Sequence, residues 1–331
     1  MARCLPFFRS QDRQPYFVSP ITGTASPLYS ESFFGWFSAT AQKQLAIYPS
    51  YSQIGRVQSK LDKQTCLSPK LETVHNVIAK IAPRKYQMDL GLRDQSTVEI
   101  TGKQWKVSQT HKVRFERMQT ADPFPIPEPA LAKLPHYLKL MYGISEDDAH
   151  KLAHWMALSM LPDQKPPILV ITGEERFEAV GQIRSIIDPA FSRHIDLPCS
   201  SKDMAQQAVE NRILTYSTDD VLSEAKIKVF KEMYSGMRAR IKDANPKRDK
   251  LYKIVNRPII IASDVEQNIN DHQISIEVNE FRTVDFAEIF GPLLDEMVKI
   301  VGQPLSYPKP LAMVMPQIAQ QPTTPQWVNT S

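Results

Sequence analysis

The residues with the clearest capacity for chemistry lie in one stretch, residues 167–189, which reads PILVITGEERFEAVGQIRSIIDP. Its apolar run, residues 168–171, predicts a buried strand. A turn at Thr172 and Gly173 follows, and then a helix that ends near Asp188. Strand, glycine turn and helix make up the frame of a phosphate-binding loop. A working loop of this kind would bind a nucleotide and position it for hydrolysis.

The groups that bind phosphate are missing from this frame. A working loop needs the pattern G-x-x-x-x-G-K-[ST], in which glycines let amides surround the phosphates, the lysine contacts them and the hydroxyl holds magnesium. Glycine is kept only at Gly173. Glu178, Ala179 and Val180 occupy the positions of the second glycine, the lysine and the hydroxyl residue. Glutamates beside a triphosphate repel it, at a cost on the order of several kcal/mol each in a low-dielectric pocket. The stretch therefore predicts a degenerate phosphate loop with no catalytic residue and no cofactor, although an ordinary α/β turn would show the same pattern.

A metal site is not expected from the histidines and cysteines. His150 and His154 are one helical turn apart, a spacing that can ligate a metal, but no third ligand completes the set. The three cysteines, Cys4, Cys66 and Cys199, are far apart and have no C-x-x-C spacing, which suits a reducing compartment. No signal peptide and no membrane span are recognised. We expect a cytoplasmic protein without a membrane partner.

Positive charge is concentrated in residues 226–258. This segment contains eleven Lys/Arg and three acidic residues, a net charge of +8, whereas the whole chain carries +4 and the remainder therefore −4. Two strands, residues 238–241 and 251–255, are predicted around the turn DANPKRD, and such a basic hairpin suits contacts to DNA phosphates. The candidate DNA-binding residues are Arg238, Arg240, Lys242, Lys247, Arg248, Lys250 and Lys253. The competing interpretation is a solvated, lysine-rich surface.

The first 121 residues divide into two predicted parts. Residues 1–66 are rich in Pro, Ser and aromatic residues without a clear period, and we expect an irregular segment. Its aromatic run, residues 33–37, is either a docking patch or a local core, and the local core is favoured. Residues 67–121 predict a small α+β domain, with an amphipathic helix at 70–82 and an antiparallel meander at 85–118.

The rest of the chain predicts a linker, two helices and an α/β core. Four prolines make residues 122–129 a linker, and two helices follow within residues 122–165, the second of them capped by Ser145. Residues 166–305 alternate apolar strands and helices, which indicates a parallel core sheet. Its expected strands are residues 168–172, 213–216, 258–263 and 274–278. Residues 306–331 are expected to be a flexible tail.

The order of several motifs resembles a bacterial protein family. The pieces are YQMDLGLRDQSTVEITGKQWKVSQTHKVRFER, PFPIPEP, EDDAHKLAHWMALSMLP, KPPILVITGEE, NRILTYSTDDV and NRPIIIASDVEQNINDHQISIEV. Together they resemble the ATPase/helicase-like proteins of prophages, plasmids and integrative elements, which are related to primase-associated helicases of superfamily 3. The resemblance spans about two-thirds of the chain. It implies a P-loop NTPase-like (AAA+/helicase-like) α/β core, preceded by a small antiparallel β domain and a helical lead-in.

The departures from this family fall on its catalytic positions. Members resemble TGEQGSGKST where this chain has TGEERFEAVG. The acidic magnesium strand maps near Asp219 and Asp220 with its register shifted by one, and these two residues form either a residual metal site or a solvated helix start. The sensor asparagine maps to Ala262 or Ser263, and the expected arginine maps near His272. The resemblance therefore implies a fold kept after ATP hydrolysis was lost.

Three hypotheses about function follow. The first is a catalytically inactive helicase-like protein of a mobile genetic element, which binds DNA as a replication accessory or regulator. The second is a protein-interaction module that pairs with itself or with an active helicase or primase, through the aromatic run at residues 33–37. The third is an ATPase with a non-standard nucleotide site.

Overall fold

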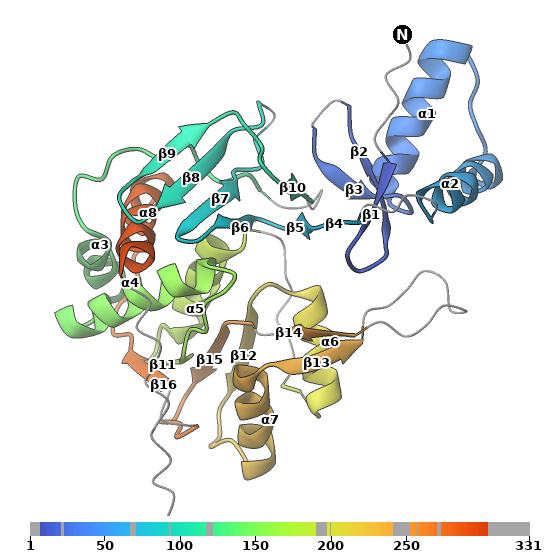
Figure 1. Ribbon diagram of the computed structural model, residues 1–331. Helices are drawn as coiled ribbons and strands as arrows, with labels where there is room; N and C mark the ends of the chain where they lie inside the picture. The colour runs from blue at the N-terminus through green and yellow to red at the C-terminus, as the bar shows by residue number, and fades with distance from the viewer. Residues whose placement is uncertain are drawn as a thin grey trace, which may run out of the picture.

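The computed structural model describes most of the chain (Figure 1). The described residues are 7–20, 23–66, 71–92, 94–116, 122–189, 197–198, 200–240, 252–255, 257–269 and 273–303. The predicted tail at 306–331 therefore lies outside the described residues. None of the helices among these ranges is long and apolar enough to cross a membrane.

The N-terminal segment is folded, so its prediction as irregular is wrong. Strands β1 (Phe7–Ser10), β2 (Pro15–Val18) and β3 (Ala25–Pro27) pair antiparallel, and helices α1 (Glu31–Leu45) and α2 (Tyr51–Cys66) follow. Strands of three or four residues are too short to show an alternation of apolar and polar residues in the sequence. These strands are stabilised by pairing with one another. We call this unit, residues 7–66, the N-terminal module.

The aromatic run forms the core of this module. Phe33 is completely buried, and its ring lies 5.1 Å from that of Phe17 and 5.6 Å from that of Trp36. Ile54 of α2 closes the same cluster. The interpretation of residues 33–37 as a local core is confirmed, because α1 turns its aromatic side chains toward the strands and α2.

The helix predicted at residues 70–82 is wrong. Strands β4 (Leu71–Glu72), β5 (Val74–His75) and β6 (Ile78–Ala82) occupy this stretch. β4 pairs in parallel with β1, and β5 pairs in parallel with β10 (Arg114–Phe115). Pairing with strands far away in the sequence overrides the local helical spacing of apolar residues.

The meander is confirmed in part: it runs from residue 78 to residue 108, and the last strand predicted within 85–118, β10, pairs with β5 instead. β6 pairs antiparallel with β7 (Lys85–Asp89), which pairs with β8 (Thr97–Thr101), which pairs with β9 (Trp105–Ser108). Helix α8 (Phe286–Gly302) packs on β8 and β9. The contact is close at the end of the helix, where a Cβ on Gly102 would lie 2.7 Å from the Cα of Gly302.

The proline-rich linker runs over α8, as a segment without helix or strand. The ring of Phe124 stacks on that of Phe290 at 5.5 Å, and a Cβ on Gly291 would lie 2.0 Å from the carbonyl oxygen of Glu128. The two helices that were expected next are α3 (Leu134–Tyr142) and α4 (Glu146–Met160). The predicted cap of α4 is confirmed, because the hydroxyl of Ser145 accepts from the amide of Asp148.

The core sheet is parallel, as expected. Its strands are β11 (Ile168–Thr172), β12 (Leu214–Thr218), β15 (Ile259–Ser263) and β16 (Gln273–Glu277), in the order β12-β15-β11-β16. Each strand lies within two residues of its predicted range.

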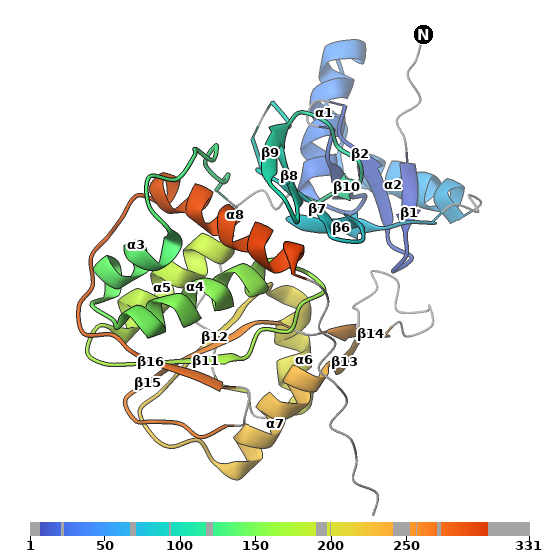
Figure 2. The same ribbon diagram turned by 60° about the vertical axis from the view of Figure 1, so that its left-hand side comes forward.

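Helices cover both faces of this sheet (Figure 2). Leu169 and Ile171 of β11 pack in one cluster with α4, α5 (Arg176–Ile187) and α8, while the alternate residues of β11 pack with α6 (Ser201–Glu210) and α7 (Glu224–Ser235). The first cluster also contains the buried face of the meander. The meander and one face of the core sheet therefore share a single hydrophobic core, with α8 and α4 between them.

Candidate functional site

The turn after β11 packs against the backbone of Val278. Gly173 has a φ of +102°, and a Cβ there would lie 2.1 Å from the carbonyl oxygen of Val278. The amide of Val278 donates to the carbonyl of Thr172 at 2.9 Å. The chain that leaves β16 thus lies directly against the turn, and only glycine fits this position.

The phosphate-loop positions are helical or buried. In a phosphate loop the motif lies between the strand and the helix, but α5 begins at Arg176, so five of the eight residues 173–180 are already helix. Glu178 is exposed, whereas Ala179 and Val180 are 0% and 2% exposed in the core below the helix. The side chains at the lysine and hydroxyl positions therefore point into the hydrophobic cluster.

An ion pair closes the carboxyl edge of the sheet. The guanidinium of Arg176 donates to the carbonyl of Gly173 at 3.0 Å, forms an ion pair with Asp264 and lies 4.3 Å from the ring centre of Phe177. Asp264 directly follows β15, and its amide donates to the carbonyl of Thr218 at 3.3 Å. The pair therefore ties the end of β11 to the end of β15. Sequence analysis gave neither residue this role, because no local pattern joins the ends of two strands.

Asp219 and Asp220 lie in an exposed turn after β12. The amide of Asp220 donates to the hydroxyl of Thr218 at 3.3 Å, and the Thr218 hydroxyl donates to the carbonyl of Asp220 at 2.9 Å. Helix α7 begins only at Glu224, so the interpretation of these aspartates as a helix start is wrong. Within the described ranges, no group of three His, Cys, Asp or Glu side chains is placed to hold a metal ion.

A buried glutamine joins the loops at the same edge. Gln267 is 2% exposed, and its amide nitrogen donates to the carbonyl of Asp220 at 3.0 Å and to the hydroxyl of Ser263 at 2.8 Å. Its amide oxygen accepts from the backbone of Leu222 at 2.9 Å. Ser263, one of the two residues at the sensor position, is therefore held inside this network. Nothing in the sequence around Gln267 indicates burial.

The basic hairpin is present in the described residues. β13 (Met237–Arg240) and β14 (Tyr252–Val255) pair antiparallel, with Ala239 opposite Lys253 and Arg240 opposite Tyr252. β13 packs on α6 and α7, beside the core sheet (Figure 1). Met237 and Ala239 are buried, and Arg238 between them is exposed. The other candidates, Lys242, Lys247, Arg248 and Lys250, lie outside the described residues.

One cation of the basic segment is internal. Arg257 donates through Nε to the carbonyl of Ala208 near the end of α6 at 2.8 Å, and Arg212 donates to the carbonyl of Met160 at the end of α4 at 3.3 Å. Burial lowers the pKa of both guanidinium groups, that of Arg212 to about 10, and the nearby carboxylate of Asp188 opposes this change. Both arginines therefore neutralise helix carboxyl ends, where positive charge is favoured.

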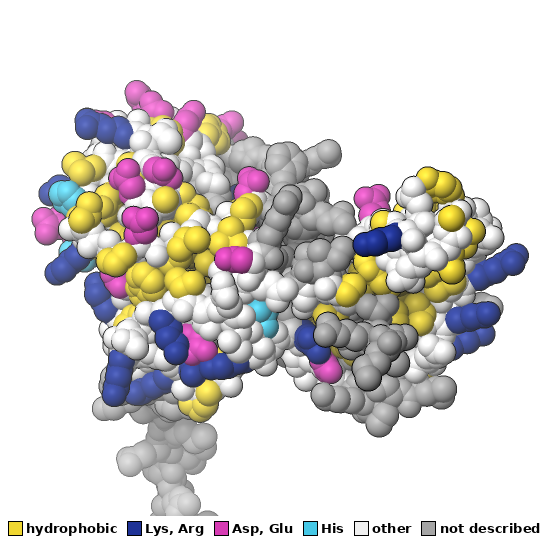
Figure 3. All heavy atoms as spheres, turned by 90° about the horizontal axis from the view of Figure 1, so that it is seen from above, with side chains coloured by type: hydrophobic (Ala, Val, Ile, Leu, Met, Phe, Trp, Pro, Cys, Tyr) yellow, Lys and Arg dark blue, Asp and Glu magenta, His cyan; other side chains and the backbone are white. Residues whose placement is uncertain are grey.

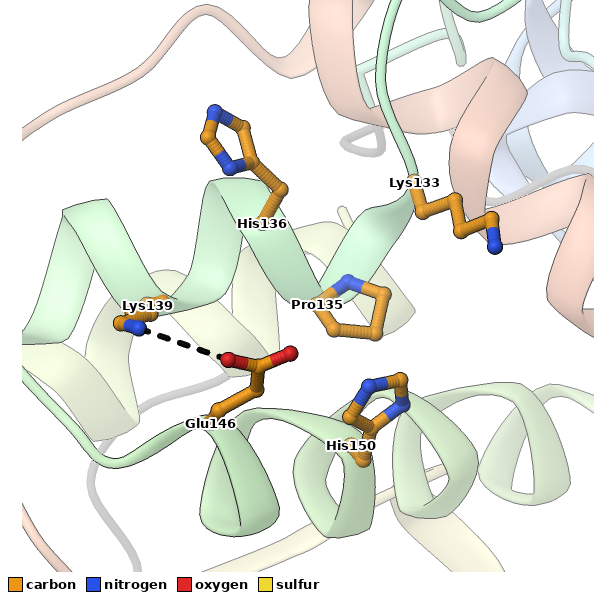
Figure 4. Close-up of a pocket in the computed structure, with 6 residues that line it drawn as sticks. All are labelled: Lys133, Pro135, His136, Lys139, Glu146 and His150. Carbon is orange, nitrogen blue, oxygen red and sulfur yellow. Dashed lines mark ion pairs between the residues drawn. The ribbon is translucent and has the colours of Figure 1, made fainter.

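A pocket of about 230 Å³ lies between α3 and α4 (Figure 4). Lys139 forms an ion pair with Glu146 across it, with the nitrogen and the oxygen 3.7 Å apart. Glu146 and His150 lie in the gap between the helices, while His136 points away from them. The lining residues are Lys133, Pro135, His136, Lys139, Glu146 and His150. The pocket contains His150 without His154, so the histidine pair singled out from the sequence does not meet there.

The comparisons with known proteins give similarities to solved structures alone. No protein-family profile matches the sequence, and no curated protein matches it. Among solved structures, the chain is similar to two apo structures of the C-terminal region of NrS-1, with TM-scores of 0.43 and 0.40 and 10% sequence identity in each case. The alignments cover 90% of this chain and 66% and 65% of those chains. The chain thus spans slightly less than two-thirds of the length of the structures it matches.

Proposed function

We propose that this protein binds DNA and does not hydrolyse ATP, as a replication accessory or regulator of a mobile genetic element. The observation that carries the proposal is the hairpin β13–β14. It lies within the basic segment, residues 226–258, and packs beside a parallel α/β sheet. Arg238 is exposed on this hairpin. Closely spaced cations on a hairpin can neutralise successive phosphates of a nucleic acid.

The residues at the carboxyl edge of the core sheet support the proposal that the protein does not hydrolyse ATP. Ala179 and Val180 are buried, and the ion pair between Arg176 and Asp264 spans the ends of β11 and β15. A triphosphate here would meet Glu174, Glu175 and Glu178 without a loop lysine. We expect ATP with magnesium to leave the melting temperature unchanged. A nucleotide at one hundred times its dissociation constant would stabilise the protein by about 2.7 kcal/mol, so a clear rise in melting temperature would favour the hypothesis of a non-standard ATPase site.

The DNA part is tested by fluorescence anisotropy of labelled single-stranded and duplex DNA at several salt concentrations. The test variant reverses four charges, R238E, R240E, K247E and R248E. The control reverses four exposed lysines elsewhere, K103E, K106E, K151E and K299E. Loss of four phosphate contacts reduces the slope of log K against log salt by about 3.6 for duplex DNA and about 2.8 for single strands.

We expect the hairpin variant to lose binding and the control to keep it. If the wild-type protein does not bind either DNA at low salt, the proposal is wrong. If both variants lose binding equally, the net charge of the protein matters and the hairpin does not.

The protein-interaction hypothesis was based on the aromatic run at residues 33–37, which belongs to the core of the N-terminal module. Phe33 lies inside the N-terminal module, and Phe34, Trp36 and Phe37 pack against the same core. A homo-oligomer or a helicase or primase partner would have to use another surface. Light scattering of the purified protein, alone and after mixing with such a partner, measures either association directly.

A further inference from the structure

Helix α2 of the N-terminal module separates its charges onto two sides. Its only carboxylate, Asp62, is turned inward, where it forms an ion pair with Arg9 and accepts from the hydroxyl of Tyr29. Its first turn contains no acidic residue. The helix therefore keeps its one negative charge inside the module.

Three cations occupy the opposite side of α2. Arg56, Lys60 and Lys63 are exposed, and in the described part of the chain no carboxylate forms an ion pair with them. Their spacing of i, i+4 and i+7 places them on one face, while Ile54 and Thr65 form the buried face. At a rise of 1.5 Å per residue, Arg56 and Lys63 are about 10.5 Å apart along the helix axis.

This face is open to a large partner. The module has its own hydrophobic cluster, and α2 lies at the outer side of the module, away from the core sheet (Figures 1 and 2). The view from above shows Lys and Arg side chains along the outer edge of this lobe (Figure 3). Uncharged polar side chains flank the three cations, among them the exposed Ser52, Ser59 and Gln64.

We propose that α2 binds in the major groove of duplex DNA. The groove is about 12 Å wide and admits one α-helix that lies along it. With the helix in this position, the three cations on its one face can contact phosphates of one strand, while the flanking polar groups face the base edges. Phosphate contacts fix the position of a protein on DNA, and polar groups in the groove read the bases.

The inference about α2 rests on the proposed function in one respect, that DNA is the ligand. The two surfaces are otherwise independent, because the hairpin β13–β14 and α2 belong to different parts of the fold. The test variant is R56Q/K60Q/K63Q in the full chain. The matched control is K103Q/K106Q/K151Q, which removes the same charge from exposed lysines on other elements. Anisotropy is measured with a labelled 20-base-pair duplex and with the corresponding single strand, and binding to phosphatidylserine vesicles is measured in parallel.

We expect the α2 variant to lower the salt slope on duplex DNA by about 2.7, which at 0.1 M salt corresponds to a loss of affinity of about 500-fold. The control should keep the wild-type slope. Because all three side chains are exposed, the melting temperature should not change. The single substitution Lys60→Gln, with a slope change of about 0.9, repeats the test with less risk to folding.

Two results would overturn the inference and leave the proposed function standing. One is an α2 variant that binds duplex DNA like the control while the hairpin variant does not. The other is an α2 variant that loses only single-strand or vesicle binding, since the cations would then serve a different polyanion. If the wild-type protein binds no DNA, both the inference and the proposed function are wrong.

Discussion

Replacing Gly173 by alanine tests why a glycine occupies the turn after β11. Two costs follow from the structure. A side chain at φ +102° lies outside the regions that L-residues favour, at a cost of about 1–2 kcal/mol. The new Cβ would also lie 2.1 Å from the Val278 carbonyl oxygen, and forcing extra atoms into a packed site costs about 1–3 kcal/mol.

The expected loss for Gly173→Ala is therefore about 2–5 kcal/mol in the free energy of unfolding, or roughly 3–7 °C in melting temperature. Calorimetry in the absence of nucleotide measures it. The control is Gly181→Ala in the same helix-forming segment, because Gly181 is exposed in α5 and a Cβ there meets nothing within 4 Å. This control should stabilise the protein by about 0.5–1 kcal/mol.

A Gly173→Ala protein that melts like the wild type would refute this reasoning. The contact with Val278 would then be loose, and Gly173 would need another explanation, such as the approach of a ligand to the turn. A large loss in Gly173→Ala beside a small gain in Gly181→Ala would instead show that packing against the chain after β16 explains the glycine.

Three further predictions concern stability and are checked by thermal or urea unfolding. Ala179→Lys should unfold the protein, because it places an amine in the core, whereas Glu178→Lys on the exposed side should change the free energy of unfolding by less than about 0.5 kcal/mol. Asp188→Asn should cost about 3–5 kcal/mol by removing a carboxylate from buried guanidinium groups, and Arg212→Met should also be destabilising, because it removes a positive charge from Asp188 and from the carboxyl end of α4. Burial lowers the pKa of His75 below its ordinary 6.5. Only the unfolded chain then takes up this proton readily, so stability should fall as pH drops below about 6.5, and His75→Gln should weaken that dependence.

The core sheet could be predicted because each of its strands has a recognisable local sequence pattern. Ile168–Thr172 is an apolar run bounded by a proline and a glycine, which is typical of a parallel strand buried on both faces. The two-residue strands β4 and β5 could not be predicted in this way. Their partners, β1 and β10, are distant in sequence, and a window of a dozen residues contains no information about them.

The sequence predicts which side chains are absent from the candidate site. It does not predict which contacts the structure forms there. The sequence shows directly that residues 178–180 do not match the G-K-[ST] part of a phosphate-loop pattern. That Arg176 meets Asp264, and that Gln267 is buried between two loops, depends on which strand ends lie side by side. Likewise, the cations of α2 do not differ in sequence from an ordinary solvated helix. The structure adds that Asp62 turns inward, and that among the described residues no carboxylate forms an ion pair with these cations.

The position of α8 has a consequence for how the protein folds during its synthesis. The meander is complete at Ser108, but the helix that covers it begins at Phe286. At 5–20 residues per second, a ribosome takes about 10–35 s to make the chain between them. During that interval the apolar face of the meander is exposed and open to aggregation or to a chaperone. The N-terminal module has its own cluster and can fold at once. Synthesis therefore first yields a folded N-terminal module joined to an uncovered sheet, and one helix near the end of the chain completes the core.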